Sequence, residues 1–380
     1  MITLQIMKSI SQNYNKYLSV LYFLFLLPCC TPKESVVKKD DNNFQRTALL
    51  NHSTEKLIMP AYLKFQQQLA DLKIGIDSFT TNTSTSNLLK ARNQWIATAI
   101  AWQKCNTFNF GPSTNFNFGT LLENVGTFPA SPQKIEQYIS NNDISMGNFD
   151  RDSRGLYGLE YLLFEPASLE ETVTKFTSSS GSIKRLNYLN ATIKDIKKNT
   201  DQVVNEWQNY GSKFVADNST NSTSSITLYY NAFLIGFENL KNFKIGIPAG
   251  KRAGQVSVAP EQAEGYYSAT SIKLIIQNFA TIAQIWKGEG LDGVDGIGFE
   301  EYIRSIEGGN TLADATSARI LEIKTKLMAI ENEDLTLLIK SKDPRITELY
   351  DLLSNTTRYF KSDMSSLLGL TITYSSGDGD

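Results

Sequence analysis

The chain has 380 residues, of which 41% are hydrophobic and 20% charged, a composition that excludes a disordered or fibrous protein. Its 37 Lys and Arg residues against 39 Asp and Glu residues leave a net charge of −2, so no overall positive field would attract nucleic acid. The single histidine excludes any metal site that needs two histidine ligands.

Residues 1–30 are typical of a signal peptide that ends in a cysteine pair. The apolar run over residues 17–28 is preceded by lysines and is too short to span a bilayer, which needs about 20 apolar residues. The segment resembles a bacterial lipoprotein signal, which has a leucine three residues before the lipidated cysteine and a small residue one before it. Leu27 and Cys29 place Cys30 in that position, with Cys29 as the alternative. We expect a lipid anchor to a membrane of the bacterial cell envelope, with the protein periplasmic or surface-exposed.

Residues 31–47 contain few large apolar groups and mix both charges, which predicts a flexible tether before a folded body that starts near residue 48. His52 and Glu55 form a His-x-x-Glu pattern just after it. Ser53 or Thr54 reads as the N-cap of the first helix, which would leave His52 outside the regular turns. We therefore do not expect a metal site at this pattern.

Apolar residues recur at three- and four-residue spacing throughout the body, which predicts amphipathic helices. The predicted helical segments are 54–72, 88–108, 183–214, 226–243, 269–286, 312–330 and 346–370. Polar segments rich in turn formers separate several of them, at 80–86, 178–182, 218–225 and 288–298. No run shows sustained two-residue alternation, so the predicted fold class is all-α.

An internal repeat predicts two similar halves. In the first half a helix ends in the sequence of residues 108–112, and Gly155 opens a later helix. In the second half a helix ends in residues 243–248, and Gly265 opens a later helix. We therefore predict two helical-bundle domains, a duplicated pair over 48–200 and 201–380, the second with a short acidic tail, although a helix could cross the boundary.

The segment Gly155-Leu-Tyr157-Gly-Leu-Glu160 resembles the Gly-x-His-x-x-Glu signature of imelysin-like proteins. Further motifs of the same family match at 92–95, 246–250, 266–268, 296–299 and 363–374. The resemblance implies an envelope protein with two helical-bundle domains and a site in the cleft between them. The family includes proteins classed as metallopeptidases, iron-regulated proteins and periplasmic components of ferrous-iron uptake.

The chain departs from the family signature at Tyr157, which stands where the family has histidine. A phenol with a pKa of about 10 is a poorer metal ligand at neutral pH than imidazole. Tyr157 and Glu160 still share a helix face, so they can point into one cavity as a hydrogen-bonding pair. Asn106 also stands where relatives tend to carry glutamate, which makes the site less acidic.

The resemblance nevertheless supplies candidate oxygen ligands for a hard cation, iron foremost. These are Glu160, Asp363 and Ser366. The residues expected to line the same site are Arg92, Trp95, Arg154, Tyr157, Tyr267 and Ser365. Glu160 lies among apolar neighbours and would need a partner if buried, for which Arg92 and Arg154 are the candidates.

Three functions follow as hypotheses. The preferred one is a non-enzymatic envelope component that binds or takes up a metal ion or a metal complex. The alternative is a metallopeptidase in which Glu160 acts as ligand or base, a reading that Tyr157 weakens because the metal then loses its histidine ligand. The third is a module that binds a partner protein or a surface polymer, for which the 17 tyrosines and 20 phenylalanines would supply contact area.

Overall fold

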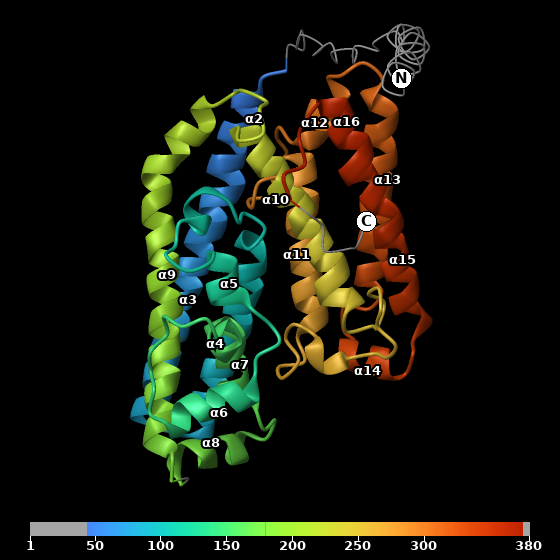
Figure 1. Ribbon diagram of the computed structural model, residues 1–380. Helices are drawn as coiled ribbons and strands as arrows, with labels where there is room; N and C mark the ends of the chain where they lie inside the picture. Colours follow the sequence, from blue (N-terminus) through green and yellow to red (C-terminus); the bar gives the residue numbers. More distant parts are fainter. Residues whose placement is uncertain (1–43, 179, 375–380) are drawn as a thin grey trace, which may run out of the picture. The chain divides into compact units, whose positions relative to one another are not determined.

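The computed structural model describes residues 44–178 and 180–374, and no strand occurs among them. The all-α class is therefore confirmed for the part of the chain that the structure describes (Figure 1). The predicted lipidation site at Cys30 or Cys29 and the acidic tail lie outside the described residues and stay predictions.

The first group of elements is built around three long helices. Its members are α2 (Arg46–Ser53), η1 (Thr54–Ile58), α3 (Met59–Thr81), α4 (Thr85–Cys105), η2 (Gly111–Thr114), α5 (Leu121–Gly126), α6 (Pro132–Ser140), η3 (Arg151–Ser153), α7 (Gly155–Phe164), α8 (Leu169–Thr177) and α9 (Ser182–Ala216). Helix α3 packs between α4 and α9, and the shorter helices α5 to α8 pack on α9, α4 and one another (Figure 1).

The second group follows in chain order. Its members are α10 (Ser225–Asn239), η4 (Leu240–Gly246), η5 (Pro260–Gln262), α11 (Ser271–Lys287), α12 (Phe299–Arg304), α13 (Gly309–Met328), α14 (Leu335–Lys340), α15 (Pro344–Arg358), η6 (Tyr359–Met364) and α16 (Ser365–Leu368). Helix α13 packs against both α11 and α15 (Figure 1). The segments η1, η4 and η6 are π-helical, so they continue the neighbouring α-helices with a wider turn.

The two groups meet where α4 packs against α11, and residues 43–380 cluster as one compact unit. Helix α9 runs without interruption across residue 200, where the sequence suggested a domain boundary. The division into two duplicated domains therefore stays a prediction. Among the described residues, no helix is both long enough and apolar enough to cross a membrane.

The long helices form where the apolar spacing predicted them. In α3 the residues Tyr62, Phe65, Leu69 and Leu72 are buried on one face, at helical spacing. The chain then turns at a polar segment, and Ser84 caps α4 because its hydroxyl accepts the Asn87 backbone N–H at 3.4 Å. This short connection explains why α3 and α4 pack against each other along their lengths.

Helix α7 is buried at every position and carries the family signature. Its apolar residues surround the whole helix, as is typical of a helix enclosed by others. The helix begins at Gly155, which has φ of +71° and whose Cβ, if present, would lie 2.6 Å from the Val125 carbonyl oxygen. Only glycine fits there, and this close approach fixes where Tyr157 and Glu160 lie.

The predicted start of the first helix is wrong. Helix α2 begins at Arg46, so His52 lies inside a helix and not before one. Leu49 and Leu50 are buried, which means that the apolar pattern starts earlier than Ser53. His52 instead reaches the second group, where its Nε2 lies 2.6 Å from the Gly288 carbonyl oxygen.

The predicted helix start at Gly265 is also wrong. The segment 263–270 forms turns, and α11 begins only at Ser271. Gly265 has φ of +75° and lies within these turns, where its left-handed conformation suits a glycine. This turn segment brings two polar side chains, Glu264 and Ser268, into the interior.

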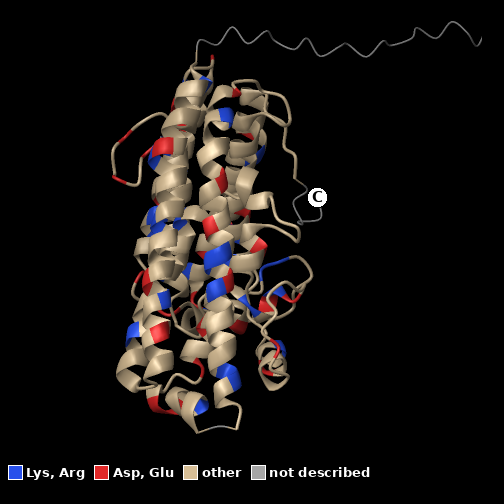
Figure 2. Cartoon of the chain, turned by 90° about the vertical axis from the view of Figure 1, so that its left-hand side faces the viewer, with Lys and Arg blue, Asp and Glu red and all other residues tan. Residues whose placement is uncertain are grey.

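Charged residues of both signs are interspersed along the helices that face the viewer in Figure 2. Several form pairs one helical turn apart, such as Lys73 with Asp77 at 2.5 Å and Lys197 with Asp201 at 2.7 Å. No single sign dominates this face, which agrees with the small net charge of the chain.

Candidate functional site

A buried polar cluster joins α4 and α7 of the first group to η4 and segment 263–270 of the second. Lys244 forms an ion pair with Glu264, and both side chains are buried. Gln103 connects to both, since its Nε2 donates to Glu264 Oε1 at 3.0 Å and its Oε1 accepts from Lys244 Nζ at 2.9 Å. The Tyr157 hydroxyl also donates to Glu264 Oε1. We call these four residues the Lys244 cluster.

Two asparagines extend the cluster along the packed helices α4 and α11. Asn106 Nδ2 donates to Gln103 Oε1 at 2.9 Å, and Asn278 Nδ2 donates to Asn106 Oδ1 at 2.9 Å. The Thr281 hydroxyl donates to the Gln103 carbonyl oxygen at 3.3 Å. Side chains of the two groups are therefore held together by a continuous chain of buried hydrogen bonds.

Burial shapes the protonation of the cluster. It lowers the pKa of Lys244, because an ammonium group loses its hydration there, and the Glu264 carboxylate acts in the opposite direction. Burial also raises the pKa of Tyr157 well above its usual value, and Glu264 adds to that effect. The phenol therefore keeps its proton at neutral pH and acts as a hydrogen-bond donor.

Glu160 lies beside the cluster but has its own partner. Its Oε1 accepts the Ser268 backbone N–H at 2.8 Å and the Ser268 hydroxyl at 2.7 Å. Burial raises the pKa of Glu160 to about 7, against the lowering effect of these hydrogen bonds. The expectation that Arg92 or Arg154 would be the partner is wrong, because each of these arginines is engaged elsewhere.

Arg92 holds the chain that follows α7. Its guanidinium donates to the carbonyl oxygens of Leu163 at 2.7 Å, Ala167 at 2.8 Å and Pro166 at 3.1 Å. It also donates to the Thr172 hydroxyl at 3.1 Å. Arg92 thus satisfies carbonyl groups at the end of α7 and just after it, and in this way it helps to hold the helix in place.

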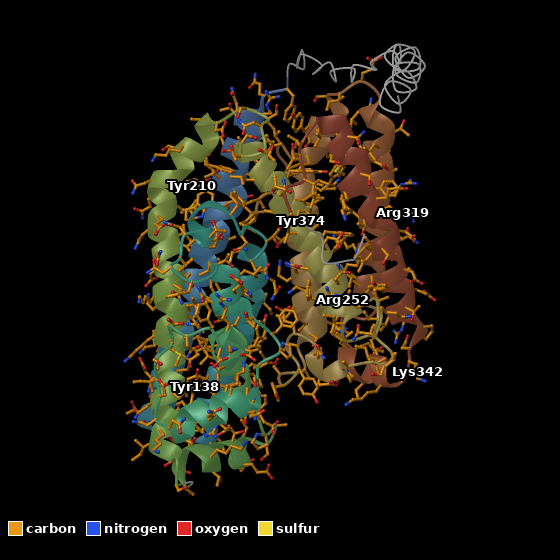
Figure 3. The ribbon with its side chains drawn as sticks, viewed as in Figure 1. Tyr138, Tyr210, Arg252, Arg319, Lys342 and Tyr374 are labelled. Atoms are coloured by element: carbon orange, nitrogen blue, oxygen red, sulfur yellow. The ribbon has the colours of Figure 1, made fainter. Side chains whose placement is uncertain are left out.

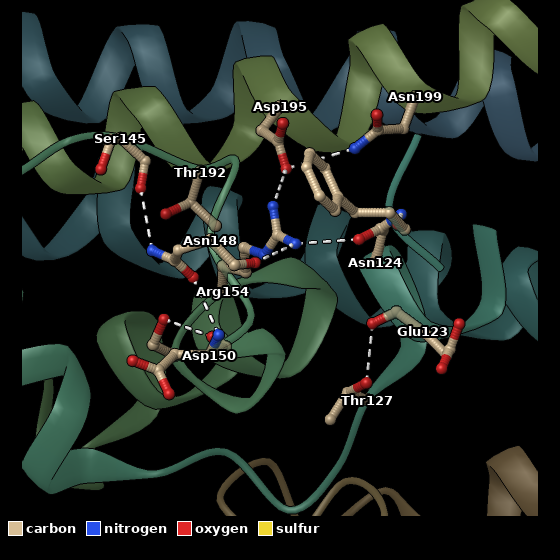
Figure 4. A network of polar contacts seen from close by, with 12 residues as sticks. Glu123, Asn124, Thr127, Ser145, Asn148, Asp150, Arg154, Thr192, Asp195 and Asn199 are labelled. Carbon is tan, nitrogen blue, oxygen red and sulfur yellow. Dashed lines mark hydrogen bonds and ion pairs between the residues drawn. The ribbon is translucent and has the colours of Figure 1, made fainter. Parts of the chain in front are cut away.

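Arg154 holds the chain that precedes α7, as Figure 4 shows. Its guanidinium lies 3.6 Å from Asp195 on α9 and donates to Asn124 Oδ1 at 2.8 Å and to the Asn148 carbonyl oxygen at 3.0 Å. Burial lowers the pKa of Arg154, and Asp195 opposes that effect. Both predicted arginines therefore support α7 from its two ends.

Two of the predicted lining residues do lie beside Tyr157 and Glu160. Trp95 donates from Nε1 to the Leu156 carbonyl oxygen at 2.8 Å, and its ring centre lies 6.3 Å from that of Tyr157. Tyr267 precedes Ser268, and its ring packs edge-on against Tyr161 at 5.4 Å. The structure thus brings together Tyr157, Glu160, Trp95 and Tyr267.

The predicted residues of the last helix lie in a different environment. Asp363 pairs with Arg358 at 3.4 Å, the Ser365 hydroxyl donates to the Lys361 carbonyl oxygen at 2.6 Å, and Ser366 is exposed. Their segment, η6 with α16, packs on α12, α13 and α15, whereas α7 packs on α4, α5, α8 and α9. Asp363 and Ser366 therefore do not join Glu160 in one ligand set.

A cavity of about 280 Å³ opens beside the Lys244 cluster. Asn106, Lys244, Glu264 and Asn278 form its polar wall, and most of the remaining lining is apolar. Leu122, Phe128, Ile235 and Phe243 belong to this apolar part. The guanidinium of Arg252, labelled in Figure 3, lies 5.0 Å from the ring centre of Phe243.

Three residues that line this cavity each have a buried polar side-chain atom with no hydrogen-bond partner among the described residues. The atoms are Trp102 Nε1, Asn109 Oδ1 and Asn278 Oδ1. Trp102 is 1% exposed and Asn278 is 2% exposed, so bulk water does not reach these side chains freely. A buried donor or acceptor without a partner costs about 1–3 kcal/mol, which a bound ligand could recover.

The residues of the cluster do not suit a resident metal ion. Within residues 44–178 and 180–374, no group of three His, Cys, Asp or Glu side chains could hold a metal ion. The Glu264 carboxylate already accepts from an ammonium, an amide and a phenol, and these donors would repel a cation. The predicted iron site therefore has no ready-made ligand set at this point.

The central residues of the cluster were not predicted from the sequence. Gln103, Lys244, Glu264 and Asn278 belong to none of the family motifs that the sequence matches. A lone lysine near a helix end and a glutamate in a turn give no sign of burial on their own. Their pairing depends on how η4 and segment 263–270 pack against α4, which spacing does not encode.

A second cavity of about 470 Å³ lies between α11 and α13. Its walls include Phe279, Ala283, Ile320 and Leu327, with Lys287 among its charged lining residues. It shares no lining residue with the first cavity and contacts none of the predicted site residues. It therefore serves as a control location for variants of the first cavity.

Comparisons with known proteins agree with the fold and the signature. The family model described as Imelysin matches residues 58–358. Iron-regulated protein A of Synechococcus elongatus is 22% identical over 272 residues, which make up 66% of this chain and 68% of that protein.

Two solved structures share the fold. An imelysin-like protein from Psychrobacter arcticum superposes with a TM-score of 0.68 at 21% identity, over 87% of this chain and 98% of that one. A protein from Parabacteroides distasonis, provisionally named an iron-regulated protein A precursor, has a TM-score of 0.67 at 18% identity, over 85% of this chain and 95% of that one. At these identities the likeness concerns the fold alone.

Proposed function

Because this chain belongs to the Imelysin family, we propose that it is a non-enzymatic binding component of the bacterial cell envelope that serves iron supply. Its ligand occupies the 280 Å³ cavity beside the Lys244 cluster. The ligand is a small organic iron chelator, free or with its metal, and not a bare ion. A lipid on Cys30, or on Cys29, holds the protein at the membrane.

One observation carries the proposal. Trp102 and Asn278 line one cavity whose remaining surface is mostly apolar, and each has a buried side-chain atom, Nε1 and Oδ1, without a hydrogen-bond partner. Cavities that bind small molecules combine apolar walls with a few polar groups that fix the orientation of the ligand. A ligand that pairs with both atoms needs a hydrogen-bond acceptor for Trp102 Nε1 and a donor for Asn278 Oδ1.

A hydroxamic acid matches this pattern in chemical terms. In the free acid, its carbonyl oxygen can accept from the Trp102 indole, and its N–H and O–H groups can donate to Asn278 Oδ1 and Asn109 Oδ1. An apolar substituent on the hydroxamate would contact Phe128 and Phe243, which line the same cavity. The same functional group binds ferric iron through its two oxygens, so a ligand that fits this cavity can also be an iron chelator.

The proposed roles in iron supply and at the cell envelope are supported by the names of relatives and by the N-terminal sequence. The name of the Synechococcus elongatus relative states that the protein is iron-regulated, and one of the solved structures carries a similar name. The apolar run ending at Cys29 and Cys30 supports a lipid anchor. Both points remain part of the proposal for this chain.

Isothermal titration calorimetry of the full-length chain with benzohydroxamic acid, alone and with ferric iron, tests the proposal. We expect binding that Asn278→Leu weakens about tenfold, the loss of one hydrogen bond. Ala232→Leu should abolish binding because it adds a side chain to the cavity wall. Ala283→Leu, the same change in the second cavity, is the matched control and should bind normally.

The outcomes separate the proposed function from its alternatives. No heat of binding from the wild-type chain, or equal binding by Ala232→Leu, would overturn the assignment of the cavity. Casein is incubated with the same preparation to test the peptidase hypothesis. Cleavage of casein that a chelator stops would favour a metallopeptidase over a binding component.

A further inference from the structure

We infer that the ammonium of Lys244 occupies a position in the Lys244 cluster where a metal ion could otherwise bind. Removal of the lysine side chain then creates a cation-binding site. The inference concerns the Lys244 cluster alone and stands whatever molecule the neighbouring cavity binds. It gives the buried Glu264 carboxylate a cation that comes from the chain itself.

The first step is the coordination of Glu264. Its Oε2 accepts from Lys244 Nζ, and its Oε1 accepts from Gln103 Nε2 at 3.0 Å and from the Tyr157 hydroxyl. Both carboxylate oxygens are therefore occupied by hydrogen-bond donors. A metal ion that binds Oε2 at the position of Nζ must displace the ammonium, whereas the amide and phenol donors face the other oxygen.

The second step is charge balance. Lys244 and Glu264 have side chains that are 5% and 2% exposed, so neither charge is stabilised by bulk water. A buried carboxylate requires a cation or a proton, and the ammonium of Lys244 supplies the charge. As long as Lys244 is present, a divalent ion at this point would add two uncompensated positive charges.

The third step is the set of oxygen atoms around the ammonium. Lys244 Nζ contacts Glu264 Oε2 and lies 2.9 Å from Gln103 Oε1. Carboxylate and amide oxygens are ligands of hard divalent cations. If the lysine side chain were truncated, Glu264 Oε2 and Gln103 Oε1 would face vacant space. The Tyr157 hydroxyl would still donate its hydrogen bond to the other oxygen of Glu264.

The fourth step is access. Lys244 and Glu264 both line the 280 Å³ cavity, so an ion with several water molecules could reach the position from there. The ring of Phe128 lies 5.5 Å from Lys244 Nζ and forms part of the same wall, where it also favours a cation through its π face. Space and charge therefore both favour a cation at the place that Lys244 fills.

Thermal unfolding of the full-length chain with and without 1 mM Mn²⁺ tests the inference. We expect no shift for the wild type and a rise in Tm of about 5 °C or more for Lys244→Ala, which gains a bound ion. The double variant Lys244→Ala/Glu264→Gln should lose that rise, because it lacks the carboxylate ligand. Lys64→Ala, at an exposed position of α3, is the matched control and should behave as the wild type.

Two results would overturn the inference. One is a folded Lys244→Ala chain whose Tm does not respond to Mn²⁺. The other is a wild-type chain that Mn²⁺ stabilises and whose response disappears in Glu264→Gln, since the cluster would then accept metal with Lys244 in place. The second result does not require Lys244→Ala to fold. Neither depends on benzohydroxamic acid, so this inference and the proposed function can fail separately.

Discussion

Two buried cations, Arg154 and Lys244, show how similar chemistry serves different purposes in this protein. Arg154 contacts Asn124, Asn148 and Asp195, all within the first group of helices (Figure 4). Lys244 contacts Glu264 in its own group and Gln103 on α4 of the other group. Each cation is paired and enclosed, so burial and pairing alone do not distinguish them.

The surroundings distinguish them. Arg154 is held by Asn124, Asn148 and Asp195 and lines neither of the two cavities described above, and these contacts fix the approach of the chain to α7. Lys244 lines a cavity that is also lined by Trp102 and Asn278, each of which has a buried polar atom without a partner. A buried ion pair therefore points to binding when it borders a cavity, as at Lys244, and to structure when it does not, as at Arg154.

The largest expected effect comes from Lys244→Met. The change leaves the Glu264 carboxylate buried without its cation, which should lower the free energy of unfolding by about 3–5 kcal/mol. Urea denaturation at pH 7.5 measures it, with Lys64→Met at an exposed position as the control, expected within about 0.5 kcal/mol of the wild type. A loss below about 1 kcal/mol would contradict the ion pair.

The next effect concerns pH. Burial raises the pKa of Glu160 from 4.5 to about 7, so between these values the folded chain holds more protons than the unfolded chain. Stability should therefore fall as pH rises through this window, by up to about 3 kcal/mol from this carboxyl group. Glu160→Gln keeps an acceptor for Ser268 but cannot ionise, so it should remove this part of the pH dependence.

Urea denaturation at pH 5 and pH 8 checks the expectation for Glu160. Glu170→Gln, on the exposed face of α8, is the matched control and should keep the full pH dependence of the wild type. An unchanged pH dependence in Glu160→Gln would show that Glu160 ionises with an ordinary pKa. In that case its enclosure beside Glu264 would be less complete than the structure indicates.

The third effect sharpens the comparison of the two cations. Arg154→Met removes the partner of Asp195, whose side chain is 15% exposed, and two further hydrogen bonds. We expect a loss of about 2–3 kcal/mol in the free energy of unfolding, less than for Lys244 because water reaches the remaining groups. The affinity for benzohydroxamic acid should stay unchanged in calorimetry. A tenfold weaker affinity would place Arg154 in the binding machinery.

Much of the fold could be predicted from the sequence because it rests on local patterns. The spacing of Tyr62, Phe65, Leu69 and Leu72 is enough to predict a helix, and the same holds for the other long helices. The predicted helix starts at Ser53 or Thr54 and at Gly265 were wrong. At both places a turn or a cap determines where the helix begins. Such boundaries depend on single residues and on what packs against them.

The site was harder to predict because its residues come from distant parts of the chain. The apolar neighbours of Glu160 correctly suggested that it is buried and needs a partner. The partner proved to be Ser268 and not an arginine, since segment 263–270 turns inward instead of forming a helix. Lys244 and Gln103 are 141 residues apart in sequence, so only the packing of η4 on α11 and α11 on α4 brings them together.

The smallest expected effect tests the residues that the sequence assigned to the site and the structure separates from it. Asp363→Asn and Ser366→Ala change partly or fully exposed side chains, so each should alter the free energy of unfolding by less than about 0.5 kcal/mol. Neither should change the affinity for benzohydroxamic acid, because neither residue lines the cavity. A clear loss of binding in either variant would show that η6 and α16 reach the ligand, and the separation of the two regions would then have to be abandoned.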